Sequence, residues 1–420
     1  MRHLLLPLSA LLISDALLLI GHGMILTLLP LRAEIENFSP TEIGFTASSY
    51  FIGFVISCLF TPHIVRRVGH IRSFAVLCSI FSAVVLLFHA LPIFALWLVL
   101  RFIIGFCISG LYMVIESWLN ERATRENRGT LLSTYTVINL SMIILGQQML
   151  NFADPASSTL FAVAAILLSL AIVPVSLTST LAPSPMPVVK LDFRRLWQIS
   201  HVGMEGAICS GLVTGAFWAL GPVYARGQGL DTAQLTLFMS GVVLGGAIFQ
   251  LPLGRISDHF DRRLVLLFSS FCGVLISLVL VFMPVQGNML LLMSVLWGGT
   301  VMTAYSICLA HTSDNAGPDD FVLIGSGILF LFGLSSALGA PLASILIALF
   351  GPEGLFMFAA LCLSGFCLAI AKRRKSHVLP IMDETEPFRP VSVTSPVIFE
   401  IDPRHNDEPS AADPTRQGHL

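Results

Sequence analysis

The chain has 420 residues, of which 55% are hydrophobic and only 11% are charged, and its formal net charge is −2. An average soluble domain carries about 25% charged residues, so this composition excludes a soluble protein of this size and indicates an outer wall that faces lipid. Residues 376–420 hold eight acidic residues and three arginines, which gives this tail a net charge of −5 and leaves +3 for the rest of the chain.

Twelve apolar segments follow one another along the chain. A hydrocarbon core about 30 Å thick needs about 20 apolar residues per helix, and the links between these segments are too short for an extramembrane catalytic domain. The first segment resembles a signal peptide, but it runs for about 26 residues without an A-x-A-like cleavage site, so we interpret it as a transmembrane helix. We expect an all-α membrane protein with twelve transmembrane helices, at 4–30, 41–61, 73–92, 95–118, 130–150, 158–180, 199–222, 233–253, 264–284, 288–310, 321–349 and 353–371.

The two halves of the chain repeat each other at an offset of 192 residues, which aligns Pro30 with Pro222 and Gly53 with Gly245. Each half has an apolar span that ends in proline, a short polar link, a second apolar span and a tight charged loop. Parallel repeats of membrane-spanning halves are characteristic of secondary transporters. We therefore predict two pseudo-symmetric six-helix bundles, a linker between them and a disordered tail with few large apolar residues. The expected bounds are 1–180 and 199–372 for the bundles, 181–198 for the cytoplasmic linker and 373–420 for the cytoplasmic tail.

The lysines and arginines lie almost entirely on one side of the predicted spans. If the N-terminus is cytoplasmic, 17 of them fall on the inner side before the tail is counted, and two, Arg32 and Arg226, fall on the outer side. Basic residues are enriched in cytoplasmic loops. The sequence therefore predicts a multi-pass protein of a bacterial inner membrane with both termini in the cytoplasm.

The loop after the eighth span carries the clearest motif, GRISDHFDRR, from Gly254 to Arg263. It resembles the loop signature of the major facilitator superfamily, in which an Asp follows a Gly by four residues and a basic pair comes after it. Gly254 lets two helix ends approach each other, and Asp258 can meet a helix N-terminus or an Arg, an interaction of about 0.3–2 kcal/mol. The same charges could instead serve only to set the topology. The resemblance implies a conformational latch at the cytoplasmic side, formed by Gly254, Asp258, Arg262 and Arg263.

The fourth span contains Arg101 followed by Gly105, a spacing that resembles the superfamily element linked to proton coupling in drug antiporters. An arginine within a span costs about 2.5 kcal/mol or more unless it faces water or a partner. Arg101 could reach the outer headgroups, but Tyr112 and Glu116 continue a polar stripe inward on the same helix face as Gly105. We therefore expect Arg101 to be functional.

Three further stretches are similar to the YcaD-like branch of this superfamily: ESWLNER at 116–122, GAFWALGPVYA at 215–225 and YSICLAH at 305–311. This resemblance covers residues 1 to about 372. It implies the twelve-helix superfamily fold and a small-molecule substrate of undefined identity.

Ionisable residues within the spans are few and are expected to be functional. Asp15 lies in the middle of the first span, and His22 lies two turns further along the same face, about 10 Å away by helix rise, which suits a relay. His22 could equally be a buried neutral histidine. The proton-coupling candidates are Asp15, His22, Arg101, Glu116 and Glu205.

In the superfamily, helices one, four, seven and ten line the central cavity. Aromatic and amide side chains on these helices and on helix five are therefore expected to contact the substrate. The candidates in the cavity are Tyr112, Gln147, Trp218, Trp297 and Tyr305, and we also note Gln148 and Gln250.

No P-loop, G-x-S-x-G, H-E-x-x-H or metal-ligand pattern appears, and the eight cysteines lie in apolar segments without C-x-x-C spacing. We therefore expect no enzyme activity, no cofactor, no metal and no nucleic-acid partner, and we expect a monomer. The prediction is a secondary active transporter that moves a small solute by alternating access and is coupled to protons. Two alternatives stay open: an uncoupled facilitator or lipid flippase of the same fold, and a non-transporting receptor that signals through its acidic tail.

Overall fold

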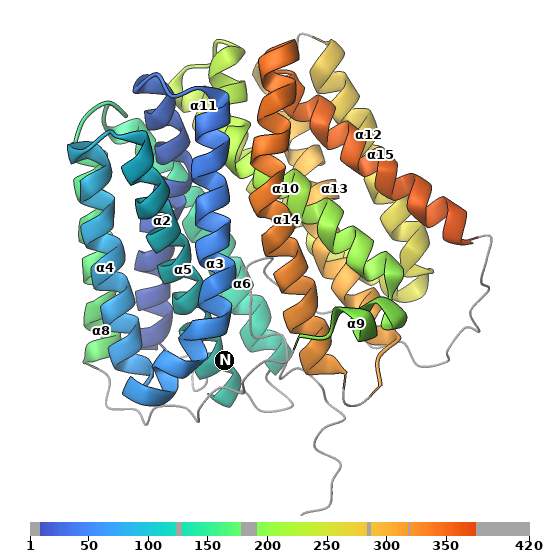
Figure 1. The fold of residues 1–420 in the computed structure, drawn as a ribbon, viewed down its shortest axis with the longest axis horizontal. Coiled ribbons are helices and arrows are strands. Elements are labelled where there is room, and N and C mark those ends of the chain that lie inside the picture. Colours follow the sequence, from blue (N-terminus) through green and yellow to red (C-terminus); the bar gives the residue numbers. More distant parts are fainter. Residues whose placement is uncertain (1–8, 123–127, 178–190, 284–286, 318–319, 375–420) are drawn as a thin grey trace, which may run out of the picture.

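The computed structural model describes residues 9–122, 128–177, 191–283, 287–317 and 320–374. These residues form long helices in two groups that stand side by side (Figure 1). The first group comprises α2 (Ser9–Ile35), α3 (Pro40–Val68), α4 (His70–Ala90), α5 (Phe94–Arg122), α6 (Arg128–Gln148), the short 3₁₀ helix η1 (Met149–Phe152), α7 (Thr159–Leu170) and α8 (Ile172–Ser176). The second group comprises α9 (Phe193–Ile199), α10 (His201–Gly227), α11 (Thr232–His259), α12 (Arg262–Phe282), α13 (Gly287–Asp314), α14 (Phe321–Phe350) and α15 (Gly354–Arg374).

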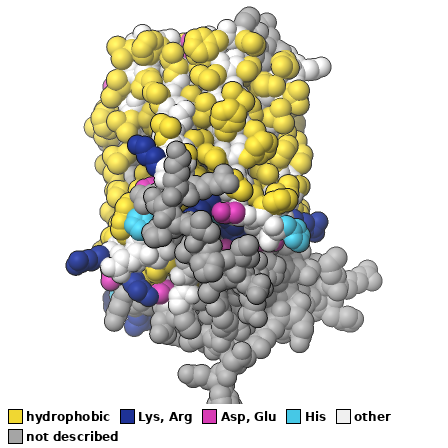
Figure 2. Space-filling view, turned by 90° about the vertical axis from the view of Figure 1, so that its right-hand side faces the viewer, with side chains coloured by type: hydrophobic (Ala, Val, Ile, Leu, Met, Phe, Trp, Pro, Cys, Tyr) yellow, Lys and Arg dark blue, Asp and Glu magenta, His cyan; other side chains and the backbone are white. Residues whose placement is uncertain are grey.

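Eleven segments of the described chain are long and apolar enough to cross a membrane. The remaining predicted span, 130–150, is the helix α6, which has the required length at 21 residues but carries Tyr135, Asn139 and Gln147 among its apolar residues. These three side chains are buried inside the protein, so the low hydropathy of α6 reflects inward-facing polar groups. Figure 2 shows the complementary feature, a nearly continuous hydrophobic side above a lower rim where charged side chains and histidines gather.

The same local signals begin corresponding helices in the two halves. Ser39 caps α3 in a capping box with Glu42, and Asp231 caps α11 in a capping box with Gln234. In a capping box, the two side chains satisfy backbone N–H groups that a helix N-terminus leaves without partners. The two boxes are related by the offset of 192 residues seen in the sequence.

Backbone contacts at glycine repeat in the same way. A Cβ at Gly105 would collide with the carbonyl of Tyr50 where α5 crosses α3, and a Cβ at Gly298 would collide with the carbonyl of Val242 where α13 crosses α11. Only glycine permits such close helix crossings. The crossings α2–α6 and α10–α14 form a second pair of this kind, through Gly23, Gly146, Gly215 and Gly339.

The helix α9 lies within the predicted linker and is attached to the start of α14. The guanidinium of Arg195 donates two hydrogen bonds to the carboxylate of Asp320, at 2.8 and 3.2 Å. These bonds hold the pKa of Asp320 below its usual value of 3.8. Residues 181–190 of the predicted linker and the predicted tail beyond Arg374 lie outside the described residues.

The two halves meet through amide and hydroxyl groups, which we call the amide seam: Gln147, Gln148, Asn151, Thr236 and Ser240. Gln148 Nε2 donates to Ser240 Oγ at 2.8 Å and to the carbonyl of Thr236 at 3.1 Å. Ser240 Oγ in turn donates to Gln147 Oε1 at 3.0 Å. The seam therefore joins the end of α6 to the beginning of α11.

Helices α3 and α14 also meet across the halves. Ser48 Oγ donates to the carbonyl of Ala337 at 2.5 Å, and a Cβ at Gly44 would stand 3.0 Å from the carbonyl of Ala340. Both contacts lie toward the same end of the molecule as the amide seam, because they involve the beginning of α3 and the second half of α14.

Candidate functional site

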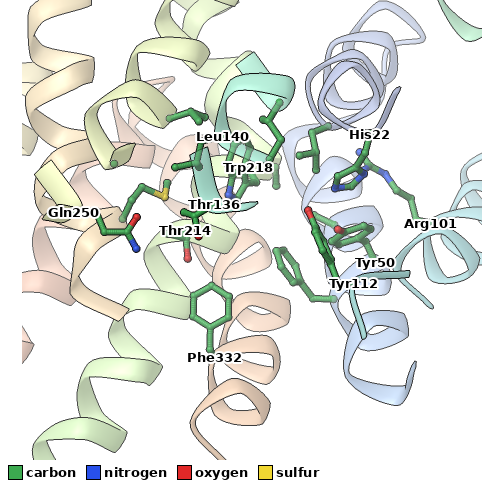
Figure 3. Close-up of a pocket in the computed structure, with 18 residues that line it drawn as sticks. His22, Tyr50, Arg101, Tyr112, Thr136, Leu140, Thr214, Trp218, Gln250 and Phe332 are labelled. Atoms are coloured by element: carbon green, nitrogen blue, oxygen red, sulfur yellow. The ribbon is translucent and has the colours of Figure 1, made fainter. Parts of the chain in front are cut away.

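A cavity of about 1120 Å³, including the part open to solvent, lies between the two halves. Its wall takes residues from α2, α3, α5 and α6 on one side and from α10, α11, α13 and α14 on the other. The wall is largely apolar and holds a small number of polar side chains (Figure 3).

Four polar residues from the first half lie together at one wall: His22, Tyr50, Arg101 and Tyr112 (Figure 3). The imidazole of His22 stacks on the ring of Tyr50, with centroids 6.3 Å apart and an interplanar angle of 15°. Arg101 is only 4% exposed. Arg101 therefore lies in the cavity wall and does not extend to the outer headgroups, the alternative that the sequence left open.

The second half supplies a different wall. Trp218 and Thr214 come from α10, Gln250 comes from α11, and Met302 and Phe332 complete the apolar surface. Gln250 Nε2 also donates to Ser306 Oγ of α13 at 3.2 Å. This wall therefore offers an aromatic and aliphatic surface with a single amide.

A buried acidic cluster lies beside the cavity, within the first half. Asp15 of α2 and Glu116 of α5 are joined through Tyr135 and Asn139 of α6, and all four are almost completely buried. With its amide oriented to satisfy its neighbours, Asn139 donates to Asp15 Oδ2 at 2.8 Å. Tyr135 Oη lies 3.4 Å from Glu116 Oε1. The other oxygen of Asp15 has no hydrogen-bond partner among the described residues.

The structure separates the predicted cavity residues into two sets. Tyr112 and Trp218 line the cavity, whereas Gln147, Trp297 and Tyr305 do not. Gln147 lies in the amide seam. Trp297 packs inside the second half, where its indole meets Phe356 edge to face and Phe217 at a tilt, and its Nε1 donates to Ser277 at 2.9 Å. Tyr305 lies one layer behind the wall and contacts Phe332 edge to face.

The predicted coupling residues divide similarly. His22 and Arg101 line the cavity, whereas Asp15 and Glu116 belong to the buried acidic cluster behind it. Glu205 lies near the beginning of α10, away from the cavity wall and from Arg101. The sequence did not identify Tyr135 and Asn139, although their spacing of four residues on a polar helix places them on one face.

The loop between α11 and α12 is built around Arg262. Its Nε donates to Asp314 Oδ2 at 2.6 Å, and its Nη2 lies 3.2 Å from Asp258 Oδ1. The loop is therefore clamped to the end of α13 by Asp314, a residue that the motif does not include. Gly254 accepts a hydrogen bond from Ser257 through its carbonyl, and the N–H of Arg263 donates to the capping carboxylate of Asp261.

The corresponding loop of the first half makes a different contact. His70, which the repeat aligns with Arg262, approaches Ser117 of α5 at 3.3 Å. Among the residues that the structure describes, no group of three His, Cys, Asp or Glu side chains is arranged to hold a metal ion.

Two repeat-related groups of membrane-spanning helices that enclose a cavity are the architecture of secondary transporters. Comparison with known proteins identifies the family. The chain belongs to the Major Facilitator Superfamily, whose model matches residues 11–319 and 203–398.

Its relatives include two bacterial proteins described as the uncharacterized MFS-type transporter YcaD. The protein of Escherichia fergusonii is 27% identical over 356 residues, which cover 84% of this chain and 92% of the relative. The protein of Salmonella typhimurium is 28% identical over 362 residues with the same coverage. These relatives confirm the predicted similarity to the YcaD-like branch.

Solved structures confirm the fold. The nucleoside transporter NupG has a TM-score of 0.73 at 13% identity, and the match covers 89% of this chain and all of that one. The D-xylose-proton symporter has a TM-score of 0.66 at 16% identity, with 87% of this chain and 97% of that one covered. The chain is thus a multi-pass membrane protein of the transporter class and not an enzyme.

Proposed function

We propose that this protein moves a small solute across a bacterial inner membrane by alternating access and couples this movement to protons. The observation that carries the proposal is the cavity between the two halves, which lies next to the amide seam at one end and next to the buried acidic cluster within the first half. The cavity and the amide seam support alternating access, and the buried acidic cluster supports coupling to protons.

Alternating access requires two stiff bodies and an interface that can open. The closest contacts within each half are between backbones at glycine, whereas the amide seam consists mainly of side-chain hydrogen bonds that water can replace. If both termini are cytoplasmic, the seam lies at the outer side. The state described here then has its outer side closed, and the cavity serves the inner side.

Proton coupling is assigned to Asp15. One of its oxygens accepts a hydrogen bond from Asn139, the other has no partner among the described residues, and the nearest joined group is a second acid, Glu116. Two buried carboxyl groups linked in this way do not readily carry two negative charges at once. A proton taken up by the cluster on one side of the membrane and released on the other would link transport to the pH gradient.

The loop at 254–263 is proposed as the conformational latch. Arg262 holds the carboxylates of Asp258 and Asp314 at 3.2 and 2.6 Å, all within the second half. In the state with the cytoplasmic side closed, these charges would instead meet the first half. Asp258 is the residue whose release from Arg262 makes this exchange possible.

The function is tested first by a metabolite-wide comparison of uptake and export between a deletion strain and its complemented form. A solute whose distribution depends on the protein is then used in proteoliposomes. A carrier retains transport after removal of residues 376–420, whereas a receptor that signals through the acidic tail loses its output. A full chain that moves no solute, together with a cellular response that is lost on truncation while insertion stays intact, would favour the receptor.

Coupling is tested with Asp15→Asn, since an amide resembles only the protonated carboxyl. We expect loss of accumulation driven by a pH gradient and retention of downhill exchange. Asp154→Asn is the matched control, because Asp154 is exposed and its carboxylate accepts a hydrogen bond from the backbone N–H of Ala156 in the link before α7. Accumulation by Asp15→Asn at the wild-type level would make Asp15 a structural residue and move the search for the coupling group to Glu205 or Glu116.

Orientation is tested by reporter fusions. Fusions after Lys375 should report the cytoplasm, and fusions near Glu36 or Gln228 should report the outer side. A C-terminus on the outer side would contradict the assignment of the amide seam to that side.

A further inference from the structure

The guanidinium of Arg101 is the feature of the cavity that transport by itself does not explain. Arg101 is 4% exposed and lies in the cavity wall. It forms no ion pair or hydrogen bond within the described residues, and its Nε is buried without a partner. A buried cation without a partner is strongly unfavourable. The guanidinium of Arg101 is therefore suited to pair with an anion that enters the cavity.

The other side chains of the cavity wall supply no negative charge to Arg101. No carboxylate lines the cavity among the residues that the structure describes. The nearest buried acids on the same side, Asp15 and Glu116, are joined to Asn139 and Tyr135 instead. His22 lies beside Arg101 in Figure 3, and its Nδ1 is also buried without a partner. The polar wall thus offers donors and positive charge.

Arg32, in the last turn of α2, shows the contrast. Arg32 is also buried, at 7% exposure, but it pairs with Glu36 and donates to the carbonyl of Ala156. Buried arginines in this protein therefore do acquire partners when the fold supplies them. The guanidinium of Arg101, in the wall of the cavity, has no such partner among the described residues.

We infer that the cavity binds an amphipathic organic anion, whose carboxylate or similar group pairs with Arg101 and whose apolar body lies against the second half. This inference rests on the proposed function, because it names the class of substrate. A planar guanidinium binds a carboxylate through two parallel hydrogen bonds, and the hydroxyl of Tyr50 and the imidazole of His22 lie close enough in the wall to complete the contact.

The rest of the cavity selects the body of the ligand. Trp218, Met302 and Phe332 provide an aromatic and aliphatic surface, and Gln250 provides one amide. A sugar with hydroxyls on every side would place some of them against the apolar side chains of the second half, and a cation would meet Arg101 without a neutralising acid among the described lining residues. An aryl or alkyl carboxylate satisfies both walls.

The inference is tested with three probes of equal shape: 3-phenylpropanoate, 3-phenylpropanamide and 3-phenylpropylammonium. Binding to the purified full chain is measured by the shift in thermal unfolding temperature and by tryptophan fluorescence, since Trp218 lines the cavity. Hydrogen bonds to a charged group are worth about 1.5–3 kcal/mol. We therefore expect the carboxylate to bind about 10- to 150-fold more tightly than the amide. Equal or tighter binding of the amide or the ammonium compound would overturn the inference.

Variants identify the residue responsible. Arg101→Gln should abolish the preference for the carboxylate, and Arg101→Lys should retain part of it. Arg32→Gln is the control and should retain all of the preference, because this substitution removes an equal charge outside the cavity. Preference for the carboxylate that persists in Arg101→Gln would also overturn the inference. The comparison of probes on the unaltered protein needs no variant to fold.

The failure of this inference and the failure of the proposed function are distinguishable. Access to the cavity from each side can be measured without any ligand, by labelling a cysteine placed at Thr214. Preference among the three probes can be measured without any transport. A carrier that exposes Thr214 on both sides but prefers the amide would keep its function and lose its assignment to anions.

Discussion

Removal of the Gln148 side chain should shift the protein toward the state that is open on the outer side. Gln148 makes two hydrogen bonds across the amide seam, to Ser240 Oγ at 2.8 Å and to the carbonyl of Thr236 at 3.1 Å. Each contributes about 0.5–1.5 kcal/mol, so Gln148→Ala weakens the closed state by about 1–3 kcal/mol. Such a difference changes a two-state equilibrium by about 5- to 150-fold.

The assay is labelling of a cysteine that replaces Thr214, which lines the cavity. With the eight native cysteines replaced, a membrane-impermeant maleimide added to the outer side reacts only when the seam is open. If opening is fast and labelling slow, the labelling rate follows the open population, so Gln148→Ala should increase it by the same 5- to 150-fold.

The matched control is Gln228→Ala at the same end of the molecule. Gln228 donates to Glu353 at 2.8 Å, and both residues belong to the second half. Its loss removes a hydrogen bond of similar geometry but leaves the seam intact, so the labelling rate should stay at the level of the unaltered seam. Equal rates in Gln148→Ala and Gln228→Ala would refute the assignment of the seam as an outer gate.

Three further outcomes follow from the structure. Gly105→Ala should lower the free energy of unfolding by about 1–3 kcal/mol, because its Cβ has no room at a helix crossing, whereas Gly365→Ala, which meets nothing within 4 Å, should leave thermal unfolding unchanged; equal melting temperatures would contradict the crossing. Hydrogen bonds from Arg195 lower the pKa of Asp320 below 3.8, so this stabilisation is complete above pH 3.8 and is lost as the pH falls through the lowered pKa. Hydrogen exchange of residues 193–199, corrected for the intrinsic rate, should therefore accelerate below that pH, and a rate that does not change would count against the pairing. Asp258→Asn should lower the transport rate with normal expression and membrane insertion, and wild-type transport would reduce the loop to a topology signal.

The sequence predicted the fold more completely than the site. Hydrophobic length, the bias of basic residues and the offset of 192 depend on local composition, and the capping boxes at Ser39 and Asp231 keep that offset in the structure. The close crossings at Gly105 and Gly298 could have been suspected from the repeat. Their carbonyl partners could not, because these lie on other helices.

The cavity was harder to predict because its helices are enclosed by protein on most sides. Trp297 and Tyr305 share a helix with Met302, yet only Met302 reaches the cavity wall. A helix that is buried almost all round shows no apolar face from which its orientation can be read. For the same reason Tyr135 and Asn139 were overlooked on α6, whose polar residues face partners on α2 and α5.

Asp314 illustrates a third limit. The motif at 254–263 contains both the cation and one carboxylate, but the shorter contact of Arg262 is to Asp314, 52 residues further on. Pairing across that distance is decided by the packing of α12 against α13. A pattern within one loop does not contain this information.

The glycine crossings also decide where the molecule is stiff. Within each half, helix backbones contact each other directly at the glycine crossings, and a backbone cannot change rotamer to relieve a contact. At the amide seam, the contacts are made by flexible side chains, which can exchange their hydrogen bonds with water. A mechanical load applied to the protein should therefore deform the seam before it deforms either half. An antibody fragment that bridges the exposed residues Asn151 and Gln234 would act as a clamp on the seam and hold the carrier in one state without occupying its cavity.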